Sequence, residues 1–185
     1  MIGLIIVGVI VVLLAVFLIG IYNSLVQLRQ RVQNAWSQVD VQLKRRYDLI
    51  PNLVNAVKGY AQHEKATFET VTQARNMAMN AGSVKEQIQA ENMISGALRS
   101  LFAVAEAYPE LKANTNFLQL QSELSDTESK IAFARQFYND TVQKFNTKIE
   151  LFPNNLVAGM LGFAMVDYFT LQGEHDARQA VKVEF

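Results

Sequence analysis

The chain has 185 residues, a formal net charge of zero and no cysteine. This length allows one compact domain with additional segments, and the lack of cysteine excludes disulfides and cysteine-based metal or redox chemistry. A protein that binds duplex nucleic acid needs an excess of basic charge on one side, so the charge balance argues against that class. Half of the residues are apolar and three are proline, and the composition between the two ends favours helices over strands.

The first predicted element is the apolar segment Ile2 to Ile21, which contains no charged residue and no Asn, Gln, His or Pro. As a helix it would be roughly 30 Å long, which matches the hydrocarbon thickness of a bilayer. A cleaved signal peptide fits less well, because no Lys or Arg precedes the run, the run is too long and the cleavage site is poor. A buried soluble helix is rarely so uniformly aliphatic. We predict a retained membrane anchor over residues 1–23, with Tyr22 at the interface.

Basic residues follow this span and none precedes it. Arg29 and Arg31 lie within the next turns, whereas only the amino terminus lies before the apolar run. The positive-inside rule therefore predicts an N-terminus outside the cell and a cytoplasmic C-terminal domain. Apolar residues continue at a spacing of about 3.5–3.6 after Tyr22, which predicts that the anchor helix continues out of the membrane.

The stretch "LKRRYDLIPNLV", residues 43–54, is typical of a junction between two helices, and five of its residues carry this interpretation: Lys44, Arg45, Arg46, Asp48 and Pro51. The three cations would end one helix, where they favour the negative end of its dipole. Asp48 would cap the next helix, and Pro51 would fall in its first turn. The alternative is one long helix kinked at Pro51.

These three cations are too far from the span to contact the head groups of their own membrane. Lys44 would lie roughly 35 Å beyond Ile21 along a continuous helix, and the Debye length at physiological salt is about 8 Å. We predict a solvated helix end at this inter-helix turn. Contact with an acidic partner, another membrane or a neighbouring subunit is the alternative.

Three further helices are predicted. An apolar stripe from Leu53 to Ala78 ends at "NAGS", and Ser83 with Glu86 forms a capping box for the next helix. The last helix carries an apolar seam at seven-residue spacing: Phe117, Leu124, Ile131, Tyr138, Phe145 and Phe152. Such a repeat predicts left-handed packing against other helices. The expected fold is all-α: an N-terminal transmembrane helix continuous with an up-down antiparallel four-helix bundle (residues 24–152), followed by a short apolar C-terminal segment.

Residues 153–185 form the predicted tail. The fourth helix, at roughly 55 Å, would return the chain to the bilayer surface. Leu156 to Val166 is apolar but only about half as long as a spanning helix. It could cover the end of the bundle, lie in the membrane interface or pack on a neighbouring subunit. The contact residues of this apolar tail are expected to be Leu156, Met160, Phe163, Met165 and Phe169.

The sequence contains few candidate catalytic or metal-binding residues. His63 has no second histidine at metal-binding spacing, and His175 stands among acids near the chain end; a zinc site needs three or four convergent ligands. Carboxylates such as Glu91 and Glu128 alternate with Lys and Arg, as on a solvated helix face. We find no nucleophile elbow, phosphate loop or di-iron pattern. We predict no cofactor, no metal site and no enzyme activity.

Several long motifs resemble the LemA family of bacterial membrane proteins: "AWSQVDVQLKRRYDLIPNLVNAVKGYAQHE", "YPELKANTNFLQLQSEL", "ARQFYNDTVQKFNTKIELFPNNLVAGMLGF" and "VKVEF". The resemblance covers nearly the whole chain. It implies a single amino-terminal span in the bacterial inner membrane, an N-out/C-in topology and a helical bundle, and it brings no catalytic residues. A magnetosome-associated member is linked to membrane invagination, and members are often encoded near membrane proteases. This chain departs from the family at "GFAMVDYF", where charged residues are more usual.

Three functions follow as hypotheses. The first is a membrane-anchored scaffold that self-assembles into a homo-oligomer and organises or remodels the lipid bilayer. The second is an adaptor that holds another membrane protein, such as a protease, through the turn that carries the three cations. The third, a hydrolase or metal enzyme, is disfavoured by the missing ligand and nucleophile patterns. No nucleic-acid partner is expected.

Overall fold

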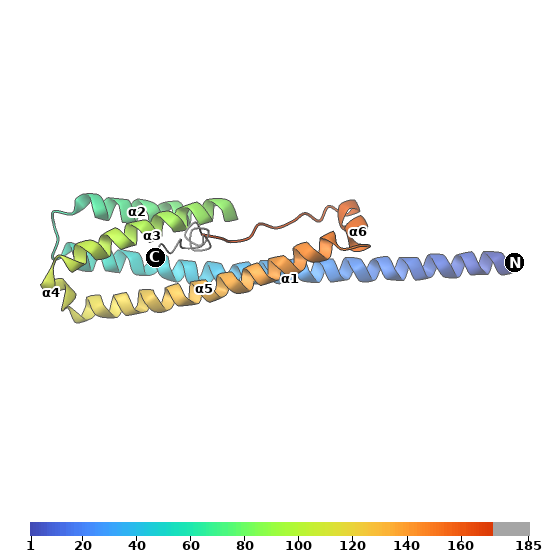
Figure 1. Ribbon diagram of the computed structural model, residues 1–185, viewed down its shortest axis with the longest axis horizontal. Helices are drawn as coiled ribbons and strands as arrows, with labels where there is room; N and C mark the ends of the chain where they lie inside the picture. Colours follow the sequence, from blue (N-terminus) through green and yellow to red (C-terminus); the bar gives the residue numbers. More distant parts are fainter. Residues whose placement is uncertain (172–185) are drawn as a thin grey trace, which may run out of the picture. The chain divides into compact units, whose positions relative to one another are not determined.

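The computed structural model describes residues 1–171, and every regular element in this range is a helix. The prediction of an all-α fold with a long apolar N-terminal helix is confirmed. Figure 1 shows the six helices: α1 (Ile2–Lys58), α2 (Lys65–Met79), α3 (Val84–Glu106), α4 (Pro109–Lys112), α5 (Thr115–Glu150) and α6 (Asn154–Met160).

The chain forms two compact units. The first unit consists of Met1–Gln38 and Gln136–Tyr168, and the second consists of Val39–Arg135 together with the described residues 169–171. Helices α1 and α5 each contribute a segment to both units.

The predicted junction at residues 43–54 is wrong, because α1 continues through it to Lys58. Pro51 lacks an N–H and therefore leaves the carbonyl oxygen of Tyr47, four residues earlier, without its helical donor. The Nε of Arg75, on α2, donates a hydrogen bond of 2.7 Å to this oxygen. The side chain of a neighbouring helix thus supplies the missing donor. Of the alternative, one long helix kinked at Pro51, the continuity of the helix is confirmed.

The first chain reversal comes at residues 59–64, after α1 has ended. The N–H groups of Tyr60 and Ala61 both donate to the carbonyl of Val57, at 3.0 and 2.9 Å. Of the three cations predicted at a solvated helix end, Lys44 and Arg45 are exposed, whereas Arg46 is only 3% exposed. Arg46 therefore belongs to the core of the second unit.

The second unit packs the distal part of α1, helices α2 and α3, the short α4 and the first part of α5 around an apolar core. Figure 1 shows α2 and α3 side by side. The predicted capping box at the start of α3 is present: the Ser83 hydroxyl accepts from the Glu86 N–H at 3.2 Å, and the Glu86 carboxylate accepts from the Gly82 N–H at 2.8 Å. The Phe102 and Phe117 rings join α3 to α5 edge to face, with centroids 6.3 Å apart.

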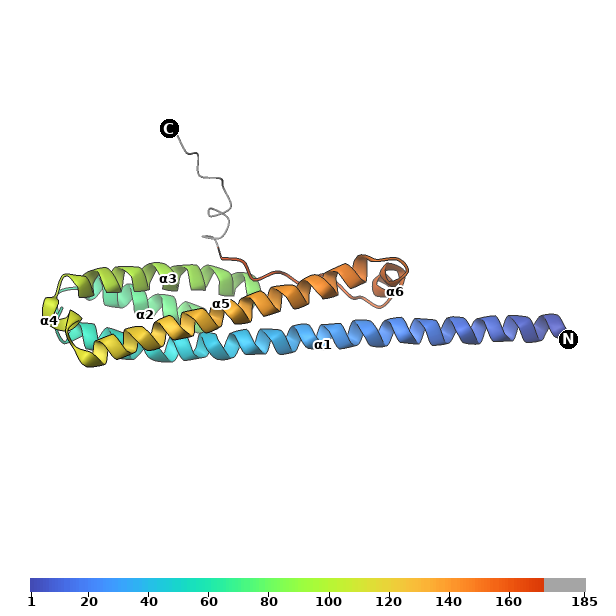
Figure 2. The same cartoon turned by 60° about the horizontal axis from the view of Figure 1, so that its bottom comes forward.

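The first unit contains the apolar part of α1. Helix α1 is the single helix among residues 1–171 whose length and composition would allow it to cross a membrane, and its most apolar stretch has no buried residue. Burial on α1 begins at Ile21 and continues at Leu25. Further along, the Trp36 ring packs edge to face on the Tyr138 ring of α5, with ring centroids 5.2 Å apart. Figure 2 shows α6 beside the end of α5, folded back toward α1.

The seven-residue seam of α5 is buried from Phe117 to Phe145, as the pattern predicts. Phe152 is the exception at 79% exposed, because α5 ends at Glu150 and Phe152 lies in the turn between α5 and α6. The end of the seam therefore does not take part in helix packing.

Candidate functional site

The first feature of interest is a contact between the C-terminal segment and the base of the apolar helix. The Phe163 ring lies 6.3 Å from the Tyr22 ring of α1 and 6.4 Å from the Phe145 ring of α5. The Arg29 guanidinium sits over the same ring, 5.1 Å from its centroid, which is a favourable cation–π distance. Phe163 thus joins α1 to α5 next to the point where burial on α1 begins.

The turn after α6 directs Phe163 into this position. Gly162 has φ of +71°, a conformation that glycine adopts without the penalty of a β-carbon. The Phe163 N–H donates to the Ala158 carbonyl at 3.0 Å, which is the long hydrogen bond of a Schellman motif. A standard helix end therefore reverses the chain and starts its return along α5.

Two side chains of α5 hold the returning backbone. The Asn146 side-chain amide donates to the Val166 carbonyl at 2.9 Å and accepts from the Val166 N–H at 3.0 Å. The Tyr138 hydroxyl donates to the Asp167 carbonyl at 2.9 Å. Burial, with a smaller contribution from the Asp167 charge, raises the pKa of Tyr138 to about 12. We call Phe163, Asn146 and Tyr138, with the backbone they hold, the clasp.

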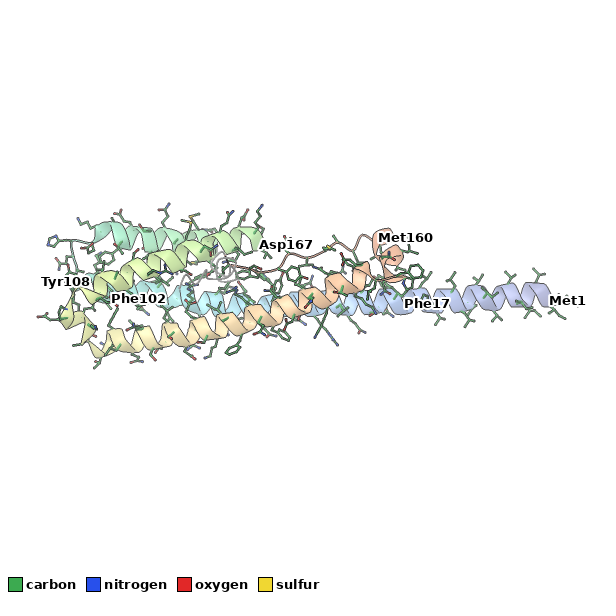
Figure 3. The ribbon with its side chains drawn as sticks, in the orientation of Figure 1. Met1, Phe17, Phe102, Tyr108, Met160 and Asp167 are labelled. Carbon is green, nitrogen blue, oxygen red and sulfur yellow. The ribbon has the colours of Figure 1, made fainter. Side chains whose placement is uncertain are left out.

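The clasp leaves a group of large apolar side chains uncovered. We call it the α6 platform, and its members are Leu151 (54% exposed), Phe152 (79%), Leu156 (59%), Met160 (87%) and Leu161 (53%). The opposite side of α6 is buried through Asn154, Val157 and Ala158. No charged residue occurs between Glu150 and Asp167. Figure 3 shows Met160 at the level of Phe17 along α1.

The five predicted contact residues of the tail are separated by the structure. Phe163 is half-buried in the clasp, and Phe169 is fully buried in the second unit, where the Arg135 guanidinium lies 5.2 Å from its ring centroid. Both therefore pack on the chain's own helices. Leu156, Met160 and Met165 stay exposed.

A second feature, a polar cluster in the core of the second unit, was missed by sequence reasoning. Arg46 donates from Nη1 to Glu91 Oε2 at 2.8 Å, and these two side chains are 3% and 1% exposed. The Arg46 Nε also lies 2.8 Å from Glu128 Oε1 on α5, without the geometry of a hydrogen bond. One buried cation thus links α1, α3 and α5.

Tyr47 and Gln87 complete this cluster. The Tyr47 hydroxyl donates to Glu91, and the Gln87 amide donates to the Tyr47 hydroxyl at 2.6 Å and to Glu91 at 2.9 Å. Burial raises the pKa of Tyr47, and the charge of Glu91 raises it further. Burial also raises the pKa of Glu128, although the Arg46 charge opposes that shift.

The prediction that Glu91 lies on a solvated face is wrong. Glu91 stands three residues before Ile94 and seven before Leu98, on the buried stripe of α3. Arg46 stands midway between Val39 and Leu53, which are both fully buried. Charged residues at stripe positions on two predicted helices were therefore the available signal for a buried ion pair.

The cluster has the arrangement of a structural network. The Arg46 guanidinium is paired with two carboxylates, and the Tyr47 hydroxyl already donates a hydrogen bond within the cluster. Across residues 1–171, no group of three or more His, Cys, Asp and Glu side chains is arranged to hold a metal ion. His63 is exposed in the connection between α1 and α2, whereas His175 and the terminal "VKVEF" lie outside the described residues.

Among the described residues, one exposed apolar helix that is long enough to cross a membrane, with an uncharged segment held beside it, is typical of a helical, membrane-associated protein. Residues 35–185 match the LemA family, and the chain belongs to this family.

Curated relatives agree with this assignment. The LemA protein of Metamycoplasma hominis is 32% identical over 158 residues, which cover 82% of this chain and 69% of that protein. Two magnetosome proteins, MamQ 2 of Paramagnetospirillum magneticum and MamQ of Magnetospirillum gryphiswaldense, are each 26% identical over 174 residues. These alignments cover 80% of this chain and 64%, just under two thirds, of each magnetosome protein. None of these names is that of an enzyme.

Proposed function

We propose that this protein is a membrane-anchored helical scaffold that self-assembles and thereby organises or remodels the bilayer. The observation that carries the proposal is the contact of Phe163 with Tyr22 and Arg29. It supports a protein in which both the amino-terminal apolar helix and the uncharged C-terminal segment meet the membrane. Two relatives are named as magnetosome proteins, and we extend a role in a membrane assembly from those names to this chain.

Self-assembly requires an uncovered lateral surface, and α5 offers one. Phe133 and Phe137 are 73% and 52% exposed and lie one helical turn apart, away from the buried seam of the same helix. Burial of a phenylalanine side chain contributes about 2 kcal/mol. Copies anchored by the same helix share one orientation in the membrane, so equivalent faces of α5 can meet. We therefore propose that a second copy of the chain covers these two residues.

The orientation is part of the proposal. Arg29 and Arg31 follow the apolar helix, and the positive-inside rule places such residues in the cytoplasm of a bacterium. Trypsin added to spheroplasts should leave the exposed connection between Lys58 and Lys65 intact and should cleave it after lysis. Cleavage in intact spheroplasts would reverse the proposed topology without touching the proposed assembly.

Assembly is tested by negative-stain imaging and light scattering of the detergent-extracted full chain at increasing concentration. We expect defined oligomers, and the double substitution Phe133→Ser/Phe137→Ser should shift them toward monomers. Met79→Ser/Met93→Ser is the matched control, since both methionines are exposed on other helices. Monodisperse monomers of the unmodified chain at all concentrations would contradict the scaffold.

The adaptor hypothesis loses part of its basis. Of the three cations assigned to a partner-binding turn, Arg46 is buried and Lys44 is engaged with Asp40 at 3.1 Å. Because all three cations lie inside α1, they do not form a loop that a partner could bind. We propose the scaffold in preference to the adaptor and to any enzyme.

A further inference from the structure

We infer that the α6 platform is a second membrane element, which lies in the interfacial region of the same bilayer leaflet from which α1 emerges. The inference rests on the membrane-anchoring part of the proposed function and is independent of self-assembly. Its ligand is the lipid surface itself, at the boundary between head groups and acyl chains.

The chemistry of the platform suits this boundary. Its five members are all more than half exposed, and the surrounding stretch from Leu151 to Val166 contains no charged residue. A contiguous apolar surface of this kind is unfavourable in water and marks a contact with a partner or a membrane. Short amphipathic helices bind the interface by burying one apolar side there while the other side packs on the protein. In α6 the inner side is occupied by Val157 and Ala158.

The position of the platform along α1 identifies lipid as the occupant. The exposed apolar part of α1, Ile2–Gly20, would be roughly 28 Å long, about the hydrocarbon thickness of a bilayer. Burial on α1 begins at Ile21, and Phe163 contacts Tyr22 immediately beyond it. The segment that carries the platform is therefore held at the end of the helix surface that lipid would cover.

The place of Met160 beside α1 also suits a contact with the membrane interface. Figure 3 shows Met160 beside α1 near Phe17, and Phe17 belongs to the uncharged apolar segment of α1. Interfacial helices bury their apolar side by about 5–10 Å. The Arg29 guanidinium lies over the Phe163 ring. In this arrangement we expect the guanidinium to lie at the level of the lipid phosphates.

The chain contains no cysteine, so a single introduced cysteine can carry a fluorophore that reports its surroundings. We would label Met160→Cys in the full chain, reconstituted in phosphatidylcholine/phosphatidylglycerol vesicles. Leu14→Cys, in the apolar helix, is the lipid control, and Met79→Cys, an exposed methionine on α2, is the aqueous control. Lipid-borne nitroxides near the head groups and aqueous iodide are the two quenchers.

We expect the label at Met160 to emit at shorter wavelength than the label at Met79 and to be quenched several-fold more by the nitroxides and several-fold less by iodide. Equal iodide quenching at Met160 and Met79 would overturn the inference. Protection of Met160 from both quenchers would overturn it as well, because a second protein copy would then be the occupant. A label at Leu14 that the nitroxides fail to quench would instead refute the membrane anchor, so the two failures are distinguishable.

Discussion

The Nε of Arg75 donates a 2.7 Å hydrogen bond to the carbonyl oxygen of Tyr47. This oxygen is the acceptor that Pro51 leaves without a donor inside α1, and a buried carbonyl without a partner costs about 1–3 kcal/mol. Arg75 on α2 therefore allows α1 to pass through a proline and to end only at Lys58.

A double-mutant cycle tests this relationship. Arg75→Leu should destabilise the unmodified chain by about 1–3 kcal/mol, because it leaves the Tyr47 carbonyl without a partner. In a Pro51→Ala background the new N–H at position 51 can donate to that carbonyl, so the same substitution should cost clearly less. Urea unfolding of the full chain in detergent, followed by circular dichroism, measures both differences. Arg99→Leu, at an exposed site, is the control, and equal costs in both backgrounds would refute the role of Arg75.

The buried pair of Arg46 and Glu91 should be sensitive to the loss of one partner. Glu91→Ala leaves the guanidinium without its buried carboxylate, and breaking such a pair typically costs about 3–5 kcal/mol. Replacing both residues together, Arg46→Met with Glu91→Leu, should recover part of this loss, since similar volumes of apolar side chain can replace a buried pair while Tyr47 and Gln87 still lack their Glu91 acceptor. Thermal unfolding measures the series. Lys44→Ala, which removes an exposed pair with Asp40, should change little.

Alkaline pH should weaken the fold through its buried phenols. The pKa of Tyr138 is raised to about 12, and burial raises that of Tyr47 as well. The unfolded chain releases these protons near pH 10 while the folded chain retains them, so the free energy of unfolding should fall as pH rises from about 10 to 12. Tyrosinate absorbance and helicity should therefore change together. Tyr138→Phe should reduce the pH dependence in this window; an unchanged slope would contradict the assignment.

Release of the clasp should be visible in hydrogen exchange. Asn146→Leu removes two hydrogen bonds to Val166, each contributing about 0.5–1.5 kcal/mol. The Val166 amide should then exchange roughly tenfold faster or more, since about 1.4 kcal/mol corresponds to one factor of ten. Asn76→Leu, on the exposed side of α2, should leave this amide unchanged. Unaltered protection in the Asn146 variant would show that the clasp does not depend on this side chain.

Features set by local periodicity were predictable. The apolar run of Ile2 to Ile21, the capping box of Ser83 and Glu86 and the seven-residue seam of α5 each depend on residues only a few positions apart. Their hydrogen bonds and helix faces are determined within one or two turns. The match to the LemA family follows from the same contiguous segments.

Features set by distant partners were not predictable. Pro51 indicates a helix end or a kink by local rules, and the residue that supplies the missing donor, Arg75, is 28 positions from Tyr47 along the chain. Arg46 resembles a solvated cation until Glu91, 45 positions away, is placed beside it. The large apolar residues of the tail give no sign that Phe163 and Phe169 are covered while Met160 is exposed.

The sequence by itself determined an all-helical member of the LemA family with an apolar N-terminal helix long enough to cross a membrane, because composition and helical spacing act over short distances. The tertiary structure alone decided where α1 ends, which charges are buried and which apolar side chains of the C-terminal segment stay exposed. Those outcomes depend on whether a donor, a counter-ion or an aromatic ring from elsewhere in the chain reaches the site, and burial is favourable only when that partner is in place.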